Sequence, residues 1–428
     1  MTMSISKENK PLYVYLQRPD NGAWVVVGRY RTEPMTGAGL FRYAASYAEA
    51  GLAWAIDPVN LPFIQGDIRQ PQRYGGLHDV LRDACPDSWG QTLLRREHGL
   101  AGSCSALRYL VLSGNGDRWG ALAVGTSASP NVAQLSSPRL SQLEALVQEL
   151  LAIAANKPAL NAALRKRLFA TPSLGGARPK ATLQDKDTYW LVKPGLLTDT
   201  VDIAMLEHAT QQWGRHAGLR FADTRLHSVT GQRSVVRVLR FDRHGSRRVM
   251  AVSGASLLQV EYPPTGPADS SGASYPRLAE ELRRIGAPAE DWTELFGRMV
   301  FNAVVGNDDD HPRNHAVIYD IDEMRWRLAP AFDVVPNPDE IPQRLAMQVC
   351  SGRSDVSRDA LLMDFDRFGF ASQTVAGQYL DQLLVRIQAG FEQAAPLLSA
   401  DLRSLMQARL SANCSLLSAP KNSNCVVP

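Results

Sequence analysis

The stretch Val304–Asn314, which reads VVGNDDDHPRN, and its sequel Leu328–Val334, which reads LAPAFDV, decide how this sequence is interpreted. The first stretch places three carboxylates, a histidine, an arginine and an asparagine directly after the run Trp292–Val304, whose apolar residues recur at helical spacing. Charged side chains are mostly exposed in proteins, so a dense polar cluster behind a buried helix is unusual. Taken alone, the cluster is compatible with a metal site, a solvated turn or a catalytic loop.

The spacing within this stretch favours the catalytic loop. Asp309 precedes Asn314 by five residues, as the catalytic aspartate precedes the metal-binding asparagine in protein kinases. There the aspartate accepts the proton of the substrate hydroxyl and the asparagine binds magnesium. Asp333 follows a strand predicted over Arg325–Leu328 and lies where a second magnesium ligand is expected. We therefore predict that Asp309 is the catalytic base.

The neighbours of Asp309 receive supporting roles. Three consecutive carboxylates need not all act on a substrate, and Asp308 and Asp310 are predicted to accept hydrogen bonds from loop amides. His311 is predicted either to hold the loop together or to contact a nucleotide. The assignment of Asp309 as the base rests on its spacing from Asn314 and not on the density of charge.

Upstream, residues 171–183 (TPSLGGARPKATL) combine paired glycines with a hydroxyl group and two cations. The segment lacks the GxxxxGK[ST] pattern of a Walker A loop, and alone it could be an ordinary flexible loop. A short apolar strand, Tyr189–Val192, follows and ends in Lys193, as the phosphate-binding lysine of kinases stands on a strand. Glu207 lies on a helix predicted over Val201–Ala217, where a kinase keeps the carboxylate that orients this lysine. A solvated surface glutamate is the alternative.

The sequence determines the roles of three further segments less closely. Ser234–Leu239 alternates as a strand before Arg240–Arg243 (RFDR), which could frame an adenine pocket or form a buried ion-pair corner. Gly114–Gly120 (GNGDRWG) is interpreted as a turn, because a strand over Ala121–Val124 follows it and not the helix of a dinucleotide fingerprint. Glu261–Tyr275, rich in Pro, Gly, Ser and Asp, is predicted to be a mobile surface loop.

The N-terminal part is predicted to be β-rich. Leu12–Leu16 alternates, Trp24–Tyr30 is apolar and β-branched, and the Asn21-Gly22 pair between them is a strong hairpin signal. Short helices are expected between Leu77 and Leu100, and a boundary at Ser127–Pro138. We predict a β-rich subdomain over 1–130, the nucleotide-binding part over 131–243, a helical lobe with the catalytic loops over 244–418 and a flexible tail over 419–428.

Composition narrows the class of protein. The 428 residues carry 46 Lys and Arg against 43 Asp and Glu, and a net charge of +3 is too small to predict nucleic-acid or membrane binding. Five cysteines without CxxC spacing favour reduced thiols over a disulfide framework or a zinc site. The N-terminus has no apolar signal segment, and no window approaches the roughly 20 apolar residues of a membrane span. We expect a cytoplasmic protein without a membrane partner.

Taken together, SLGGARPKATL, WLVKP, RFDR, GNDDDHPRNHA and LAPAFDV resemble the HipA family of bacterial serine/threonine kinase toxins, over about Ser173–Asp333. RYGGL (Arg73–Leu77) and CPDSWG (Cys85–Gly90) are similar to the N-terminal subdomain of that family. The resemblance implies an α+β, two-lobed protein-kinase-like fold with a β-rich N-terminal subdomain and a mainly helical C-terminal lobe. It also implies ATP and Mg²⁺ as cofactors. The implied partners are a small DNA-binding antitoxin, operator DNA through the antitoxin complex, and a protein substrate, since family substrates include aminoacyl-tRNA synthetases.

The resemblance also assigns residues. Ser173 matches the family's autophosphorylated serine, whose modification is expected to displace the loop and switch the kinase off. Leu239 stands where some relatives have an acidic residue, so the linker is expected to meet adenine only through its backbone. The implied set is Asp309 as base, Asn314 and Asp333 as magnesium ligands, Lys193 as phosphate lysine with Glu207 orienting it, Gly175, Gly176, Ala177, Arg178 and Lys180 as nucleotide loop, Leu239, Arg240 and Phe241 as adenine-side linker, and His311 at the nucleotide.

The leading hypothesis is therefore an ATP- and Mg²⁺-dependent serine/threonine protein kinase that acts as the toxin of a toxin–antitoxin pair. One alternative is a kinase-like regulatory module whose main role is to bind antitoxin and operator DNA. The intact set of Asp309, Asn314 and Asp333 argues against that as the only role. The other alternative is a kinase for a small molecule, which would phosphorylate a metabolite and not a protein.

Overall fold

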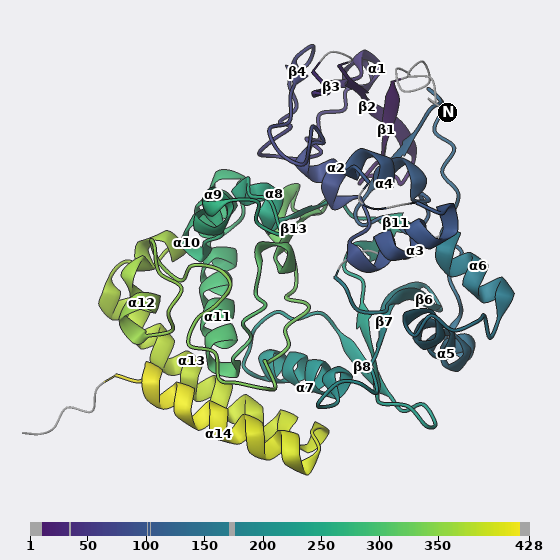
Figure 1. The fold of residues 1–428 in the computed structure, drawn as a ribbon. Helices are drawn as coiled ribbons and strands as arrows, with labels where there is room; N and C mark the ends of the chain where they lie inside the picture. The colour runs from purple at the N-terminus through teal and green to yellow at the C-terminus, as the bar shows by residue number, and fades with distance from the viewer. Residues whose placement is uncertain (1–10, 34–35, 101, 103, 171–175, 420–428) are drawn as a thin grey trace, which may run out of the picture.

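A computed structural model of the chain describes residues 11–33, 36–100, 102, 104–170 and 176–419 (Figure 1). Ser173 and Gly175 of the predicted nucleotide loop, and the predicted tail after residue 419, lie outside the described residues. In Figure 1 helices lie beside the antiparallel sheets in the first half of the chain, and the second half is mainly helical. This is an α+β arrangement.

The N-terminal part is a five-stranded antiparallel sheet with the strand order β4-β3-β2-β1-β5. The predicted hairpin is confirmed, since β1 pairs with β2 and Gly22 takes a φ of +75° in the turn between them. The alternating residues Leu12, Val14 and Leu16 are buried on one face. The elements are β1 (Leu12–Gln17), β2 (Trp24–Thr32), β3 (Gly39–Tyr43), α1 (Ala45–Glu49), β4 (Ile68–Arg69), α2 (Asp79–Asp83), α3 (Ser88–His98), α4 (Ala106–Leu112) and β5 (Leu122–Gly125).

A second antiparallel sheet, ordered β6-β7-β9-β8, carries the predicted lysine strand. On one face Leu183 and Val192 pack with α5 and α6 in a single apolar cluster. Side chains alternate along a strand, so Lys193 points to the other face, where its register partner is Val236. The elements are α5 (Leu143–Ala154), α6 (Ala162–Ala170), β6 (Ala181–Asp185), β7 (Thr188–Pro194), α7 (Ile203–His216), β8 (Thr224–His227) and β9 (Val235–Leu239).

The rest of the chain is mainly helical, with a small sheet, β12-β13-β14, beside the helices. None of the described helices has the length and apolar character that a membrane span requires. The elements are β10 (Arg243–His244), β11 (Arg247–Arg248), β12 (Ala251–Ser253), α8 (Gly254–Leu258), α9 (Pro267–Gly272), α10 (Tyr275–Arg284), α11 (Ala289–Val305), β13 (Ala316–Asp320), β14 (Arg325–Leu328), α12 (Arg358–Met363), α13 (Gln373–Ala394) and α14 (Ala400–Leu417).

The prediction of a mobile surface loop over Glu261–Tyr275 is wrong in part, because helix α9 lies inside this segment. Pro267 stands in the first turn of α9, a position that suits its fixed φ and its missing N–H. The Asp269 carboxylate accepts hydrogen bonds from the amides of Glu261 and Thr265, both at 2.9 Å. The composition of a segment does not reveal tertiary hydrogen bonds of this kind. The segment is therefore more regular than its Pro, Gly, Ser and Asp content predicts.

The buried helix α11 delivers the chain to the polar stretch, as predicted. Its apolar stripe is buried from Leu295 to Val305, while Trp292 at its start is partly buried, and Gly306, with a φ of +72°, ends the helix. The Asn413 side chain of α14 donates to the carbonyl oxygens of Ala303 at 3.1 Å and Val304 at 2.9 Å. These last-turn carbonyls have no partner within their own helix, so α14 completes the end of α11.

His78 makes the stability of the N-terminal part sensitive to acid. Its Nε2 donates to the carbonyl oxygen of Arg69 at 3.1 Å, and its ring meets Phe41 edge-on. Burial lowers the pKa of His78 to about 4, against about 6.5 in an unfolded chain. Between these two values the unfolded chain binds a proton that the folded chain rejects, so the free energy of unfolding falls as pH decreases.

We expect the unaltered chain to lose up to about 3 kcal/mol through His78 between pH 7 and pH 4. His78→Gln should make that decline shallower by the same amount, as measured by urea unfolding at both pH values. His98→Gln alters an exposed histidine and should leave the decline unchanged. A decline in His78→Gln as steep as in the unaltered chain would contradict the assignment.

Candidate active site

A cavity of about 520 Å³ lies between the second sheet, the polar stretch after α11 and the N-terminal part. Leu191 and Lys193 of β7 and Val236 and Val238 of β9 line it, as their shared face predicts. Its size suits a small-molecule ligand. The predicted site residues along its walls are Gly176, Ala177, Arg178, Lys180, Lys193, Glu207, Leu239, Arg240, Phe241, Asp309, His311, Asn314 and Asp333.

Lys193 is held between two carboxylates. Its Nζ donates to Glu207 Oε1 and to Asp333 Oδ1, both at 2.7 Å. Burial alone lowers the pKa of Lys193, but the charges of Asp333 and Glu207 outweigh it and raise that pKa above its usual range. Glu207 is buried on α7, so it is not the solvated surface residue of the alternative interpretation. The lysine therefore presents a fixed positive charge to the cavity.

The three consecutive aspartates face different surroundings. Asp308 accepts a hydrogen bond from the Asn337 side chain at 3.0 Å. Asp310 is buried and accepts from the Tyr275 hydroxyl and the Ala346 amide, both at 2.6 Å. Asp309 is 77% exposed, and within the described residues its carboxylate accepts no hydrogen bond. Asp309 is thus the member of the three that is left available to a ligand.

The electrostatics of Asp309 suit a proton acceptor. Partial burial, and then the neighbouring charges of Asp333 and Asp308, raise the pKa of Asp309 above its usual range. A general base works best when its pKa lies near the working pH. The nearest cationic candidate is His311, whose Nε2 lies 3.9 Å from Asp309 Oδ1. Burial lowers the pKa of His311 to about 4, so this ring is neutral near pH 7, and among the described residues the Asp309 carboxylate then has no ionic partner.

Asn314 and Asp333 offer oxygens that suit magnesium. The Asn314 side chain donates its amide hydrogen to the carbonyl oxygen of Asp309 at 2.8 Å, which leaves its Oδ1 as the free group. Burial raises the pKa of Asp333, but Lys193 and Lys180 outweigh it and hold that pKa well below its usual range. In the described part of the chain no group of three or more His, Cys, Asp or Glu could hold a metal ion. Magnesium does not need such a group, since it is bound through one or two carboxylates, waters and substrate phosphates.

The predicted nucleotide loop is anchored by the CPDSWG segment. The Trp89 amide donates to the carbonyl oxygen of Gly176 at 3.1 Å, and its indole Nε1 donates to that of Lys180 at 3.0 Å. The side chain of Lys180 is buried at the cavity, whereas Arg178 forms an ion pair with Asp199. One tryptophan of the N-terminal part therefore fixes both ends of the described loop.

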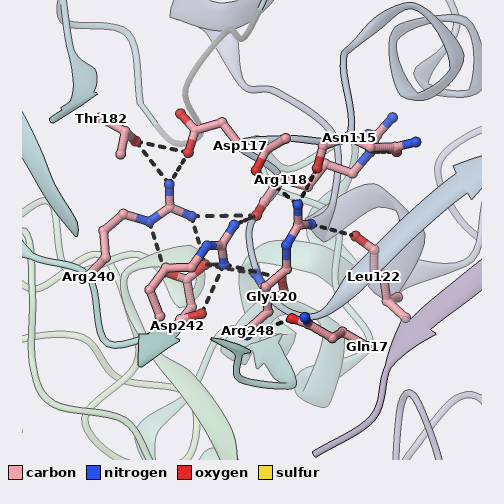
Figure 2. Close-up of polar contacts among 12 residues, drawn as sticks. Gln17, Asn115, Asp117, Arg118, Gly120, Leu122, Thr182, Arg240, Asp242 and Arg248 are labelled. Atoms are coloured by element: carbon pink, nitrogen blue, oxygen red, sulfur yellow. Dashed lines mark hydrogen bonds and ion pairs between the residues drawn. The ribbon is translucent and has the colours of Figure 1, made fainter. Parts of the chain in front are cut away.

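The linker after β9 is a buried ion-pair corner that also lines the cavity. Arg240 donates to the Asp242 carboxylate at 2.8 Å and to that of Asp117 (Figure 2). The main-chain amide of Leu239 donates to the carbonyl oxygen of Asp223 at 2.8 Å, and that of Arg240 donates to the carbonyl oxygen of Tyr189 at 2.9 Å. These two donors are therefore already used within the fold. The Arg240 side chain forms this ion-pair corner, which is one of the two interpretations that the sequence left open for the RFDR segment.

The sequence interpretation missed the contribution of the N-terminal part, which it treated as a structural layer. Asp83, Cys85, Asp87 and Trp119 all line the cavity. The guanidinium of Arg313, in the polar stretch, lies 3.1 Å from Asp87 Oδ1 and 3.5 Å from Asp83 Oδ1. The CPDSWG motif was the only available signal, because contacts between residues more than 200 positions apart leave no local pattern.

Comparisons with known proteins identify the family and several relatives of this chain. The family model described as HipA-like C-terminal domain matches residues 172–394, just over half of the chain. The putative kinase Y4mE of Sinorhizobium fredii is 33% identical over 141 residues, which cover 31% of this chain and 32% of that protein. A putative kinase of Haemophilus influenzae is 26% identical over 180 residues, 38% of this chain and 52% of that protein. The chain thus spans about a third and about half of the length of these relatives.

The fold comparison covers nearly the whole chain. HipA of Shewanella oneidensis MR-1, solved with HipB and its operator DNA, superposes with a TM-score of 0.70 at 16% identity. The match covers 94% of this chain and 96% of that one. At this identity the likeness concerns the fold, and it confirms the predicted two-lobed, kinase-like α+β architecture. With the family model spanning more than half of its residues, the chain belongs to the HipA family.

Proposed function

We propose that this chain is an ATP- and Mg²⁺-dependent serine/threonine protein kinase that acts as the toxin of a toxin–antitoxin pair. The observation that carries the proposal is Lys193, held at 2.7 Å from both Glu207 and Asp333 beside the available carboxylate of Asp309. This is the charge arrangement that phosphoryl transfer uses, since the catalyst mainly positions groups and neutralises charge. The kinase relatives and the HipA family model support it.

In the proposed reaction, Lys193 neutralises phosphate oxygens of the nucleotide. Asn314 and Asp333 would hold a magnesium ion, which would supply further positive charge to the phosphates. Asp309 orients the substrate hydroxyl and accepts its proton. A new oxygen–phosphorus bond forms at the γ-phosphoryl group, while the bond to the β-phosphate oxygen breaks and ADP leaves. Asp308 and Asp310, occupied by Asn337 and Tyr275, hold the loop in place.

The proposed partners are a small DNA-binding antitoxin, operator DNA bound through that antitoxin, and a protein substrate. The support is the Shewanella oneidensis HipA structure, which contains HipB and operator DNA and shares this fold over 94% of the chain. Aminoacyl-tRNA synthetases are the first substrate class to test, because the family resemblance implies them.

Autophosphorylation of Ser173 tests the kinase proposal directly. Purified chain incubated with labelled ATP and magnesium is expected to acquire one phosphate on the peptide that contains Ser173, as read by mass spectrometry. Chelation of magnesium should abolish the label, because the charge on the phosphates is then no longer neutralised. Ser173→Ala should lose it, whereas Ser129→Ala, which alters an exposed serine, should retain it. Label found only at other residues would contradict the regulatory assignment, and no label on any protein would contradict the kinase.

A further inference from the structure

The glycine-rich segment Gly114–Gly120 reaches the cavity through one side chain, Trp119. Trp119 faces Phe241 of the linker, with ring centroids 6.5 Å apart and ring planes at 87°. Phe241 in turn lies 5.2 Å from Phe332, which precedes the predicted magnesium ligand. All three rings line the cavity, and they come from three distant parts of the chain.

The main chain on both sides of Trp119 is bonded to the linker that carries Phe241. The Gly120 amide donates to Asp242 Oδ2 at 2.9 Å, and the guanidinium of Arg243 donates to the carbonyl oxygens of Gly120, at 3.3 Å, and of Arg118. Figure 2 shows Arg240 and Asp242 directed at this segment. The position of the indole relative to Phe241 is therefore set by buried charge-assisted bonds.

The rest of the segment is fixed by two further arginines. Arg118 is buried and donates to Asn115 Oδ1 at 2.7 Å and to the carbonyl oxygen of Ala84 at 3.0 Å. Arg248 donates to the carbonyl oxygens of Asn115 at 2.6 Å and Gly116 at 2.9 Å. Buried polar networks whose members are satisfied make a segment rigid. A rigid loop that presents a partly exposed indole to a cavity is suited to hold a flat apolar ligand.

We propose that Trp119 and Phe241 together form the wall that binds the base of the nucleotide, so that the N-terminal part completes the nucleotide site. This inference rests on the proposed function, because it assigns the base end of the same cavity. The two rings are nearly perpendicular, so a flat base that lies parallel to one ring meets the edge of the other, and both arrangements are favourable. Trp119 is a binding residue in this scheme and not a catalytic one, since it contacts the base and no reacting atom.

The test compares two ligands on the full chain. Trp119→Ala is expected to raise the dissociation constant of Mg-ATP about tenfold in calorimetry, because stacking on a base is lost. Binding of magnesium triphosphate, which has no base, should stay unchanged. Trp54→Ala removes a similarly half-buried indole from the N-terminal part outside the cavity and should leave ATP affinity unchanged.

The outcomes separate the two proposals. Equal ATP affinity for Trp119→Ala and the unaltered chain overturns the role of Trp119, whereas an unaltered chain that binds no ATP overturns the proposed function. Trp119→Phe keeps an aromatic ring at this position. It provides a second test if the alanine variant does not fold. Energy transfer from tryptophan to bound mant-ATP should fall in Trp119→Phe, and transfer equal to that of the unaltered chain also overturns the inference.

Discussion

Replacing Asp309 with asparagine is expected to lower the rate constant of phosphoryl transfer about a thousandfold, because general bases contribute on the order of 10²–10⁴. Asparagine keeps the shape of the side chain but cannot accept the proton of the substrate hydroxyl. ATP affinity should change little, since Lys193, Asn314 and Asp333 are intact and Asp309 is assigned to the hydroxyl. Transfer of labelled phosphate gives the rate, and calorimetry with Mg-ATP gives the affinity.

Asp308→Asn is the matched control, because it removes the same charge from the adjacent position. Asp308 accepts a hydrogen bond from Asn337 and is predicted only to support the loop, so its loss should lower the rate by much less. If both variants lose activity equally, the negative charge of the loop matters and not the specific carboxylate of Asp309. The assignment of the base would then be wrong.

Asp242→Ala is expected to destabilise the fold by about 3–5 kcal/mol, the usual cost of removing one partner from a buried ion pair. The Asp242 carboxylate accepts from Arg240 at 2.8 Å, Arg243 at 2.7 Å and the Gly120 amide at 2.9 Å. Burial raises the pKa of Asp242, but the charges of Arg240 and Arg243 outweigh it and hold that pKa well below its usual range. Alanine would leave two buried guanidinium groups with Asp117 as the remaining carboxylate of the corner.

Urea unfolding near pH 7 measures this loss, and Asp67→Ala is the control. Asp67 forms a pair with Arg69 in which both side chains are more than a third exposed, so its removal should leave the unfolding midpoint nearly unchanged. If Asp242→Ala is as stable as Asp67→Ala, the ion-pair corner around Arg240 does not hold the N-terminal part against the linker. The position of Trp119 would then need another explanation.

Local patterns explain why much of the architecture could be predicted. The hairpin at Gly22, the lysine strand and helix α11 follow from alternation and helical spacing, which act over a few residues. The five-residue spacing of Asp309 and Asn314 is of the same kind. Their roles remain predictions, but the cavity does bring both residues together with Lys193 and Asp333.

What could not be predicted depends on contacts between distant segments. Arg240 pairs with Asp117 across 123 positions, and Arg313 approaches Asp87 across 226. Nothing in the local sequence around an arginine or an aspartate indicates which distant residue it will pair with. The segment around Trp119 was correctly interpreted as a turn, yet its contact with the cavity arises from the tertiary fold alone.

The closure of helix α11 by Asn413 has a consequence for the order of events during synthesis. Every described residue that lines the cavity precedes Asn413 in the chain, so a growing polypeptide contains these predicted site residues before it contains the group that secures the end of α11. Chains generally acquire their structure from the amino end as they are made. A nascent chain therefore carries the predicted site residues while the support at the end of α11 is still missing, so we expect the polar stretch after α11 to become fixed in one of the last steps of folding.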